Sequence, residues 1–83
     1  MNLCFVLGQI ISEVRFDFIL HSKNISVTRF EVELGNKSKI KVKGYNEIAE
    51  ECYQKLRIGD RVLIRGNLDS KGIITIQELK EWE

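Results

Sequence analysis

The sequence predicts an all-β chain with one helix, folded as a single small domain over residues 1–83. Short apolar or alternating stretches recur along it, separated by turn-forming glycine, asparagine and aspartate, which is typical of β-strands. Only residues 46–56 space their apolar side chains as a helix does. The chain has 83 residues, of which 43% are hydrophobic and 30% are charged. This is the balance of a globular domain.

The first strand is expected over residues 2–12 and carries apolar side chains on both faces. A strand of this kind is normally buried on both faces, so we expect a second subunit to cover the outer one. Gly8 lies in its middle, where a glycine often marks a bulge or a sharp bend. Residues 13–20 then alternate between polar and apolar side chains, and Phe16 and Phe18 are among the apolar ones. We expect both rings in the core, and contact with a ligand is the alternative.

The second long strand is expected over residues 25–34. Its apolar side chains change parity near Thr28 and Arg29. A strand with such a change turns inside out unless an extra residue absorbs the shift. We therefore predict a β-bulge at this point.

The third strand, residues 37–44, alternates lysine with apolar residues. Its lysines share one face and are called the lysine row: Lys37, Lys39, Lys41 and Lys43. The helix follows, with Asn46 as its expected N-cap. Residues 61–68 and 73–79 form the fourth and fifth strands, joined by a tight turn at residues 69–72.

Three strands, one helix and two strands, in that order, predict a five-stranded OB-fold barrel with its helix between strands three and four. Five short strands are too few for a sandwich of the immunoglobulin type. OB-folds bind oligonucleotides or sugars over the face of their second and third strands. We therefore expect the ligand on residues 25–34 and 37–44.

Four segments resemble bacterial single-stranded DNA-binding proteins in their order and spacing: residues 2–10, 28–32, 40–44 and 59–68. Members of that family usually present aromatic residues at the positions of Lys37 and Lys43, where bases stack. With its short hairpin, the chain is closer in layout to a minimal relative, such as the dimeric primosomal replication protein of the same superfamily. The resemblance implies an OB-fold that binds single-stranded DNA.

The positive charge of the chain is concentrated in the lysine row. Overall, 13 Lys and Arg face 12 Asp and Glu, whereas residues 37–44 hold four lysines and no acid. Alternate residues of a strand lie about 6.6–7 Å apart, close to the phosphate repeat of an extended nucleic-acid strand, so the row can neutralise phosphates. Lysine is also the ordinary polar half of an alternating strand, and on an edge strand it discourages aggregation.

Three arginines on neighbouring strands are expected to face outward beside the lysine row: Arg29, Arg61 and Arg65. We expect Arg29 and Arg65 to extend the binding groove, because a guanidinium binds phosphate through two hydrogen bonds. A cross-strand pair with Glu31 or Glu33 is the alternative.

Two aromatic residues are candidates for base stacking. Tyr45 is the better one, and its alternative is to pack over the end of the helix. Trp82 caps the barrel, joins an interface or stacks on a base, and the sequence does not choose among these roles.

Catalysis, a metal site and a cofactor are not expected. The chain has one histidine, His21, and two cysteines, and it lacks the glycine motifs of nucleotide-binding enzymes. Cys4 and Cys52 are expected to be free buried thiols of a reducing compartment. The longest apolar run, residues 3–7, is far shorter than the roughly 20 residues of a membrane span. No export signal opens the chain, so we expect a cytoplasmic location and no membrane partner.

These observations favour a protein that binds single-stranded DNA without sequence preference, in replication, recombination or mobile-element maintenance. We expect a homodimer or a tetramer, with replication or repair proteins as further partners. Two alternatives stay open. One is an OB-fold that serves protein interaction in a replication complex, with weak or no nucleic-acid binding. The other is an OB-fold that binds RNA.

Overall fold

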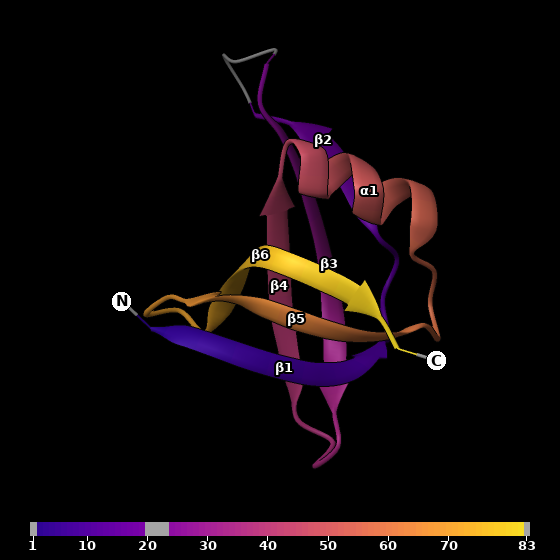
Figure 1. Ribbon diagram of the computed structural model, residues 1–83, viewed down its shortest axis with the longest axis vertical. Coiled ribbons are helices and arrows are strands. Elements are labelled where there is room, and N and C mark those ends of the chain that lie inside the picture. The colour runs from indigo at the N-terminus through magenta and orange to yellow at the C-terminus, as the bar shows by residue number, and fades with distance from the viewer. Residues whose placement is uncertain (1, 20–23, 83) are drawn as a thin grey trace.

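The computed structural model describes residues 2–19 and 24–82. In chain order the elements are β1 (Leu3–Ile10), β2 (Arg15–Phe18), β3 (Ser26–Leu34), β4 (Lys39–Tyr45), α1 (Glu47–Lys55), β5 (Arg61–Leu68) and β6 (Ile73–Glu81). Figure 1 shows β1, β5 and β6 crossing in front of β3 and β4, with α1 and β2 at the upper end. Among the described residues, no helix is long and apolar enough to cross a membrane.

Five of the strands close into a barrel in the order β1-β5-β6-β4-β3, and β1 also pairs with β3. β4 and β6 run parallel, whereas the other neighbours in the barrel are antiparallel. The helix follows the third strand of the barrel and precedes the fourth. The predicted five-stranded OB-fold is therefore confirmed. β2 lies outside the ring, paired with β3.

Alternate side chains of the barrel strands fill its interior, because successive residues of a strand point to opposite faces. Each barrel strand supplies a fully buried aliphatic residue: Ile10, Val32, Val42, Ile64 and Ile74. Cys52 on α1 and Leu56 after it pack into the same core. Burial, reinforced by the charge of Glu51, raises the pKa of Cys52 to about 12. The thiol therefore stays protonated and contributes to packing.

β3 pairs with β4 along its length without a shift in register. The bulge predicted near Thr28 and Arg29 is therefore wrong. Thr28 takes an inward position and is fully buried, and its hydroxyl donates a hydrogen bond of 2.7 Å to the carbonyl oxygen of Arg15. A polar side chain whose hydrogen bond is satisfied can occupy such a position. Because Thr28 is polar, the sequence pattern did not show that it faces inward together with Phe30 and Val32.

The register shift of the barrel lies instead between Arg65 and Gly66, opposite β6. A Cβ at Gly66 would meet the carbonyl oxygen of Thr75. Gly8 is similarly crowded, with the carbonyl oxygen of Glu33 2.6 Å from the position a Cβ would take. β1 pairs with both β5 and β3 at Gly8, and its register with β5 runs through this residue unbroken. Gly8 therefore marks the point where the barrel closes and not a bulge.

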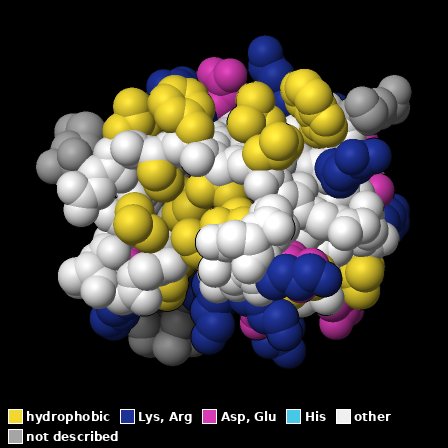
Figure 2. Space-filling view, turned by 90° about the horizontal axis from the view of Figure 1, so that it is seen from below, with side chains coloured by type: hydrophobic (Ala, Val, Ile, Leu, Met, Phe, Trp, Pro, Cys, Tyr) yellow, Lys and Arg dark blue, Asp and Glu magenta, His cyan; other side chains and the backbone are white. Residues whose placement is uncertain are grey.

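The outer face of β1 stays exposed in the single chain. Leu3, Phe5 and Leu7 expose 52%, 68% and 52% of their surfaces. In Figure 2, hydrophobic side chains line the upper part of the face, on the side where β1, β5 and β6 lie. The outward side chains of β1 are therefore apolar, as the sequence indicated. Nothing in the described part of the chain covers them.

Phe16 and Phe18 lie on β2, outside the barrel. Phe16 is half-buried, and its ring centroid is 5.2 Å from that of Tyr53 on α1. Phe18 is 63% exposed. The expected core burial of Phe18 is therefore wrong, because the apolar face of β2 meets the helix and solvent and not the interior of the barrel.

The helix begins after Asn46, as expected, but the Asn46 side chain does not cap it. Its Oδ1 instead accepts a 3.2 Å hydrogen bond from the backbone N–H of Ser26. This bond connects the start of β3 to the start of the helix and so holds the two elements together at the upper end of the barrel.

Candidate nucleic-acid interface

The outward side chains of β2, β3 and β4 form one continuous face. Arg15 on β2 is opposite Arg29 on β3, and Arg29 is opposite Lys43 on β4. Neighbouring strands lie about 4.8 Å apart, so three cationic residues stand side by side across three strands. We call these three residues the cation row. Within residues 2–19 and 24–82, no carboxylate forms an ion pair with any of them.

A groove of about 580 Å³ runs over this face, bounded by residues 12–15, β3, β4 and the start of β6. Its lining includes the cation row, Glu31, Lys41 and Ile73. We call it the β3–β4 groove. β3 and β4 are the second and third strands of the barrel, so the groove lies where OB-folds bind their ligands. In Figure 1, β3 and β4 lie behind the crossing strands β1, β5 and β6.

The residues opposite the lysine row divide it into two parts. Two of its lysines have acids directly across the strand pair, Glu33 opposite Lys39 and Glu31 opposite Lys41. Lys43 instead belongs to the cation row. Opposite charges across a strand pair attract, whereas like charges repel. The uncompensated positive charge is therefore greatest at the Lys43 end of β4.

Lys37 lies before β4, in the turn that follows β3, with a φ of 70°. The predicted third strand thus begins two residues late, at Lys39. Lys37 does not line the β3–β4 groove; it lines a separate hollow with Arg61 and Trp82.

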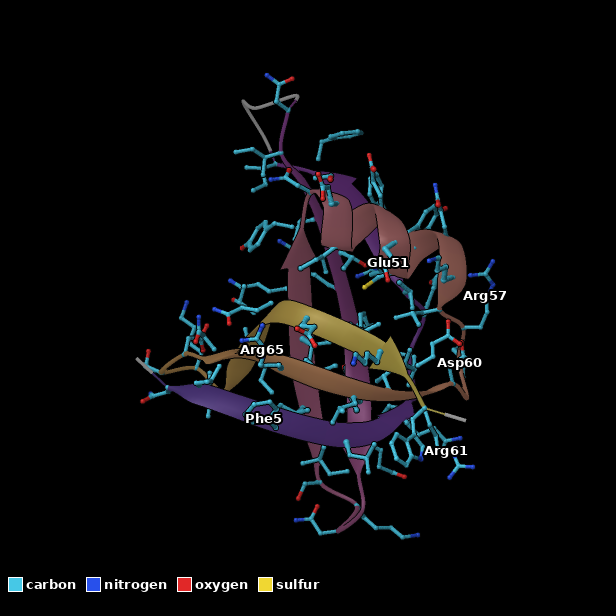
Figure 3. The ribbon with its side chains drawn as sticks, in the orientation of Figure 1. Phe5, Glu51, Arg57, Asp60, Arg61 and Arg65 are labelled. Atoms are coloured by element: carbon cyan, nitrogen blue, oxygen red, sulfur yellow. The ribbon has the colours of Figure 1, made fainter. Side chains whose placement is uncertain are left out.

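Arg65 lies on the other face of the barrel. On β5 it is opposite Phe5, and its Nη2 is 3.2 Å from Oε2 of Glu78 on β6. Figure 3 shows Arg65 and Phe5 on the strands that cross in front of β3 and β4. Arg65 is therefore separated from the groove that the sequence expected it to extend.

Tyr45 ends β4 beside the cation row. The Lys43 Nζ lies 5.7 Å from the centroid of the Tyr45 ring, which is a cation–π distance. Tyr45 is half-buried and lies opposite the buried Val27. The ring therefore stands next to the highest positive charge of the face, where a base can stack on it.

Sequence reasoning missed Arg15 as a site residue. Its outward parity within residues 13–20 was visible, but the partner of that stretch was not. Pairing of β2 with β3 brings Arg15 beside Arg29. One feature of the sequence pointed to Arg15: like Arg29 on the next strand, it is a cation whose side chain was expected to face outward.

Asp69, in the turn between β5 and β6, is an acid close to the groove. Its Oδ1 accepts hydrogen bonds of 3.0 Å and 2.8 Å from the backbone N–H groups of Ile73 and Lys71. The hydrogen bond from Ile73 is the main reason that the pKa of Asp69 lies below its ordinary value. The bond from Lys71 and the charges of Lys43 and Lys71 lower this pKa further. The carboxylate is therefore ionised at neutral pH, and its charge interacts with that of Lys43.

Within the described ranges, no three His, Cys, Asp or Glu side chains gather closely enough to hold a metal ion. His21, which the sequence analysis considered, lies outside those ranges. The cation row offers electrostatic attraction, and the ring of Tyr45 beside it offers a surface for stacking.

The sequence by itself matches little, whereas the fold matches many solved structures. No model of a known protein family matches the chain, and no curated protein matches it. The SSB domain of a Synechococcus protein superposes with a TM-score of 0.85 at 21% identity, over 95% of this chain and 93% of that one.

Two further neighbours give the same result. The small single-stranded DNA-binding protein of Streptomyces coelicolor has a TM-score of 0.87 at 17% identity, over 99% of this chain and 95% of its own. The protein PriB of Ralstonia solanacearum has a TM-score of 0.82 at 10% identity, over 100% of this chain and 99% of its own. The resemblance seen in the sequence thus extends to the whole fold.

Proposed function

We propose that this protein binds single-stranded DNA in the β3–β4 groove, without sequence preference, as a module of the cytoplasm. The cation row is the observation that carries the proposal, because it places three cations, none of them in an ion pair with a described carboxylate, side by side on the ligand-binding face of an OB-fold. The solved structures with the same fold include proteins described as binding single-stranded DNA. Such binding would serve replication, recombination or mobile-element maintenance.

The strand contacts the cation row across β4, β3 and β2 and then continues along β4. Phosphates contact the cation row and Lys41, which all line the groove, whereas Lys39 does not line it and is a weaker contact. Bases turn toward Tyr45 on one side of the row and toward Ile73 on the other. Contacts to the phosphate backbone carry no sequence information, so the absence of sequence preference follows from this arrangement.

A salt titration tests the proposal. If the cation row and Lys41 each neutralise one phosphate, log K for an oligo-dT that fills only the β3–β4 groove should fall with log salt at a slope of about −0.7 × 4, close to −3. Fluorescence anisotropy of labelled oligo-dT at several salt concentrations measures this slope, and unlabelled duplex and oligo-U competitors distinguish single-stranded DNA from duplex and RNA. Binding that is independent of salt, or no binding at low salt, would contradict the proposal.

The protein assembles as a homodimer through β1, which is the second part of the proposal. Within the described chain, residues 3–7 pair with β5 along one edge, whereas pairing with β3 begins only at Gly8. The exposed side chains on this stretch, Leu3, Phe5 and Leu7, are symmetric about Phe5. Two antiparallel copies of β1 can therefore pair edge to edge about a two-fold axis at Phe5, which brings the apolar side chains of the two copies together.

Sedimentation velocity tests the assembly. We expect a species of twice the 9.7 kDa chain mass, and we expect Phe5→Glu to yield the single chain, because a charge at the axis meets its own copy. A wild-type species of single-chain mass at micromolar concentration would contradict the dimer.

A second candidate function is protein interaction within a replication complex. Exposed apolar side chains on and beside α1 favour it, since Tyr53 and Ile58 expose 54% and 65% of their surfaces. Absence of any oligo-dT binding at low salt, from a protein that is folded and dimeric, would favour this function over the first.

A further inference from the structure

A second hollow, of about 320 Å³, lies by the end of β6 and shares no lining residue with the β3–β4 groove. Its lining combines cations, an acid, an aromatic ring and neutral side chains, chiefly Lys37, Arg61, Glu33, Trp82, Leu7 and Gln9. We call it the Trp82 hollow. Figure 3 shows Arg61 close to the C-terminal end of β6.

Strand register joins this hollow to the DNA-binding face. Gln9 on β1 is opposite Arg61 on β5 and also opposite Glu33 on β3. Glu33 is in turn opposite Lys39 on β4. At the other end, the backbone N–H of Trp82 donates a 2.7 Å hydrogen bond to the carbonyl oxygen of Arg61. A line of outward residues thus runs around the barrel from β4 to Trp82.

The chemistry of the hollow suits a strand of nucleic acid. Trp82 exposes 52% of its surface, and its indole is a flat surface on which any base can stack. Lys37 and Arg61 are both exposed beside it, and Glu33 is the one acid among the residues that line the hollow. Two cations around an exposed aromatic ring fit a ligand that alternates phosphates with flat rings.

The backbone of Lys37 has an unusual conformation for a lysine. Its φ of 70° lies in the left-handed region, where glycine is favoured and other residues are strained. The turn is closed by a 2.9 Å hydrogen bond from the Lys37 N–H to the carbonyl oxygen of Leu34. Lysine thus occupies a position that glycine would fit better.

We propose that the Trp82 hollow is a second subsite for the same DNA strand, an inference that rests on the proposed function. From Lys43 the route covers about 13 Å along β4 and about 19 Å across four strand intervals. A single strand within the roughly 4–16 nucleotides that an OB-fold holds can therefore reach both sites. In the hollow, a base stacks on Trp82 while Lys37 and Arg61 contact the adjacent phosphates.

The fluorescence of Trp82 offers a direct test, because it is the only tryptophan in the chain. Oligo-dT of about 15 nucleotides is long enough to span both sites. We expect its addition to lower Trp82 emission and to raise the anisotropy of the labelled oligonucleotide with the same Kd. The two readouts are recorded in parallel titrations at one protein concentration.

Single charge reversals test the phosphate contacts. Arg61→Glu and Lys37→Glu should each weaken binding about three- to fivefold and make the salt slope shallower by about 0.7. Lys55→Glu is the matched control, since Lys55 is exposed on α1 and lines neither site. It should bind within about twofold of the wild type.

Lys37→Gly separates a binding effect from a folding effect. Glycine relieves the left-handed backbone, so the thermal midpoint should stay level or rise while the affinity for the 15-nucleotide oligo-dT falls about threefold. Loss of affinity with retained stability is the result that a merely structural role for Lys37 would not give.

Three results would overturn the subsite. Anisotropy that rises with no change in Trp82 emission excludes it and leaves the proposed function standing, as do Lys37 and Arg61 variants that bind like the Lys55 control. Trp82 emission that changes with protein concentration and not with DNA assigns this residue to a contact between copies of the chain. If oligo-dT fails to bind at all at low salt, the proposed function fails and the subsite with it.

Discussion

The two ends of β4 carry the same residue type on the same outward face, yet their surroundings differ. At the upper end, Lys43 lies beside Arg29 and Arg15. Toward the lower end, Lys41 and Lys39 lie opposite glutamates. The difference teaches that the charge available to a ligand depends on what stands across the strand pair. Regular spacing of lysines along one strand does not by itself make a binding site.

The largest effect is expected from reversing charge at the upper end. Arg29→Glu with Lys43→Glu removes two cations from the row and introduces two repulsive acids, so oligo-dT affinity should fall about 30-fold or more and the salt slope should lose about 1.4. Anisotropy titrations at several salt concentrations measure both quantities.

The matched control reverses two charges at the lower end. Lys39→Glu with Lys41→Glu should weaken oligo-dT binding only about three- to tenfold, because each of these lysines already has an acid opposite it. Equal losses from the two double variants would show that the ends of β4 do not differ.

Stacking at the upper end gives the next effect. Tyr45→Ala removes the ring beside Lys43 and should weaken oligo-dT binding about tenfold, since stacking of one base is worth about 1–3 kcal/mol. The salt slope should not change, because no phosphate contact is lost. Tyr45→Phe serves as the control and should bind like the wild type; a wild-type affinity for Tyr45→Ala would remove the stacking role.

Neutralising the acids should make the lower end resemble the upper one. Glu31→Gln with Glu33→Gln releases Lys41 and Lys39 from their opposite charges, so affinity for oligo-dT should rise about three- to fivefold and the salt slope should steepen. The same titrations detect this gain. An unchanged affinity would indicate that the strand does not reach the lower end of β4.

The smallest effect concerns the acid near Lys43. Asp69→Asn removes the negative charge and keeps an oxygen that can accept the backbone bonds of the turn, so affinity should rise about twofold. Hydrogen bonds and nearby lysines hold the pKa of Asp69 below its ordinary value. We therefore expect no step in oligo-dT affinity from Asp69 between pH 5 and 8, and a step in that range that disappears in the variant would contradict this assignment.

Sequence periodicity alone was enough to predict the order of the five barrel strands and the helix. Alternation in residues 37–44 and the helical spacing in residues 46–56 arise from contacts within one segment, so they can be read from that segment alone. The order of the segments then predicted the OB-fold, which the barrel confirms. Parity failed at Thr28, where a satisfied hydroxyl lies in the core, and at Phe18, which is exposed on β2.

The site itself depended on tertiary structure. Arg15 and Arg29 are neighbours because β2 pairs with β3, and Arg65 is removed from the groove because β5 crosses the other side of the barrel. The sequence determined which side chains of each strand face outward, since that follows from local backbone geometry. Only the fold decided which strands lie side by side, and therefore which charges add and which cancel, because Coulomb energy depends on distance in space and not along the chain.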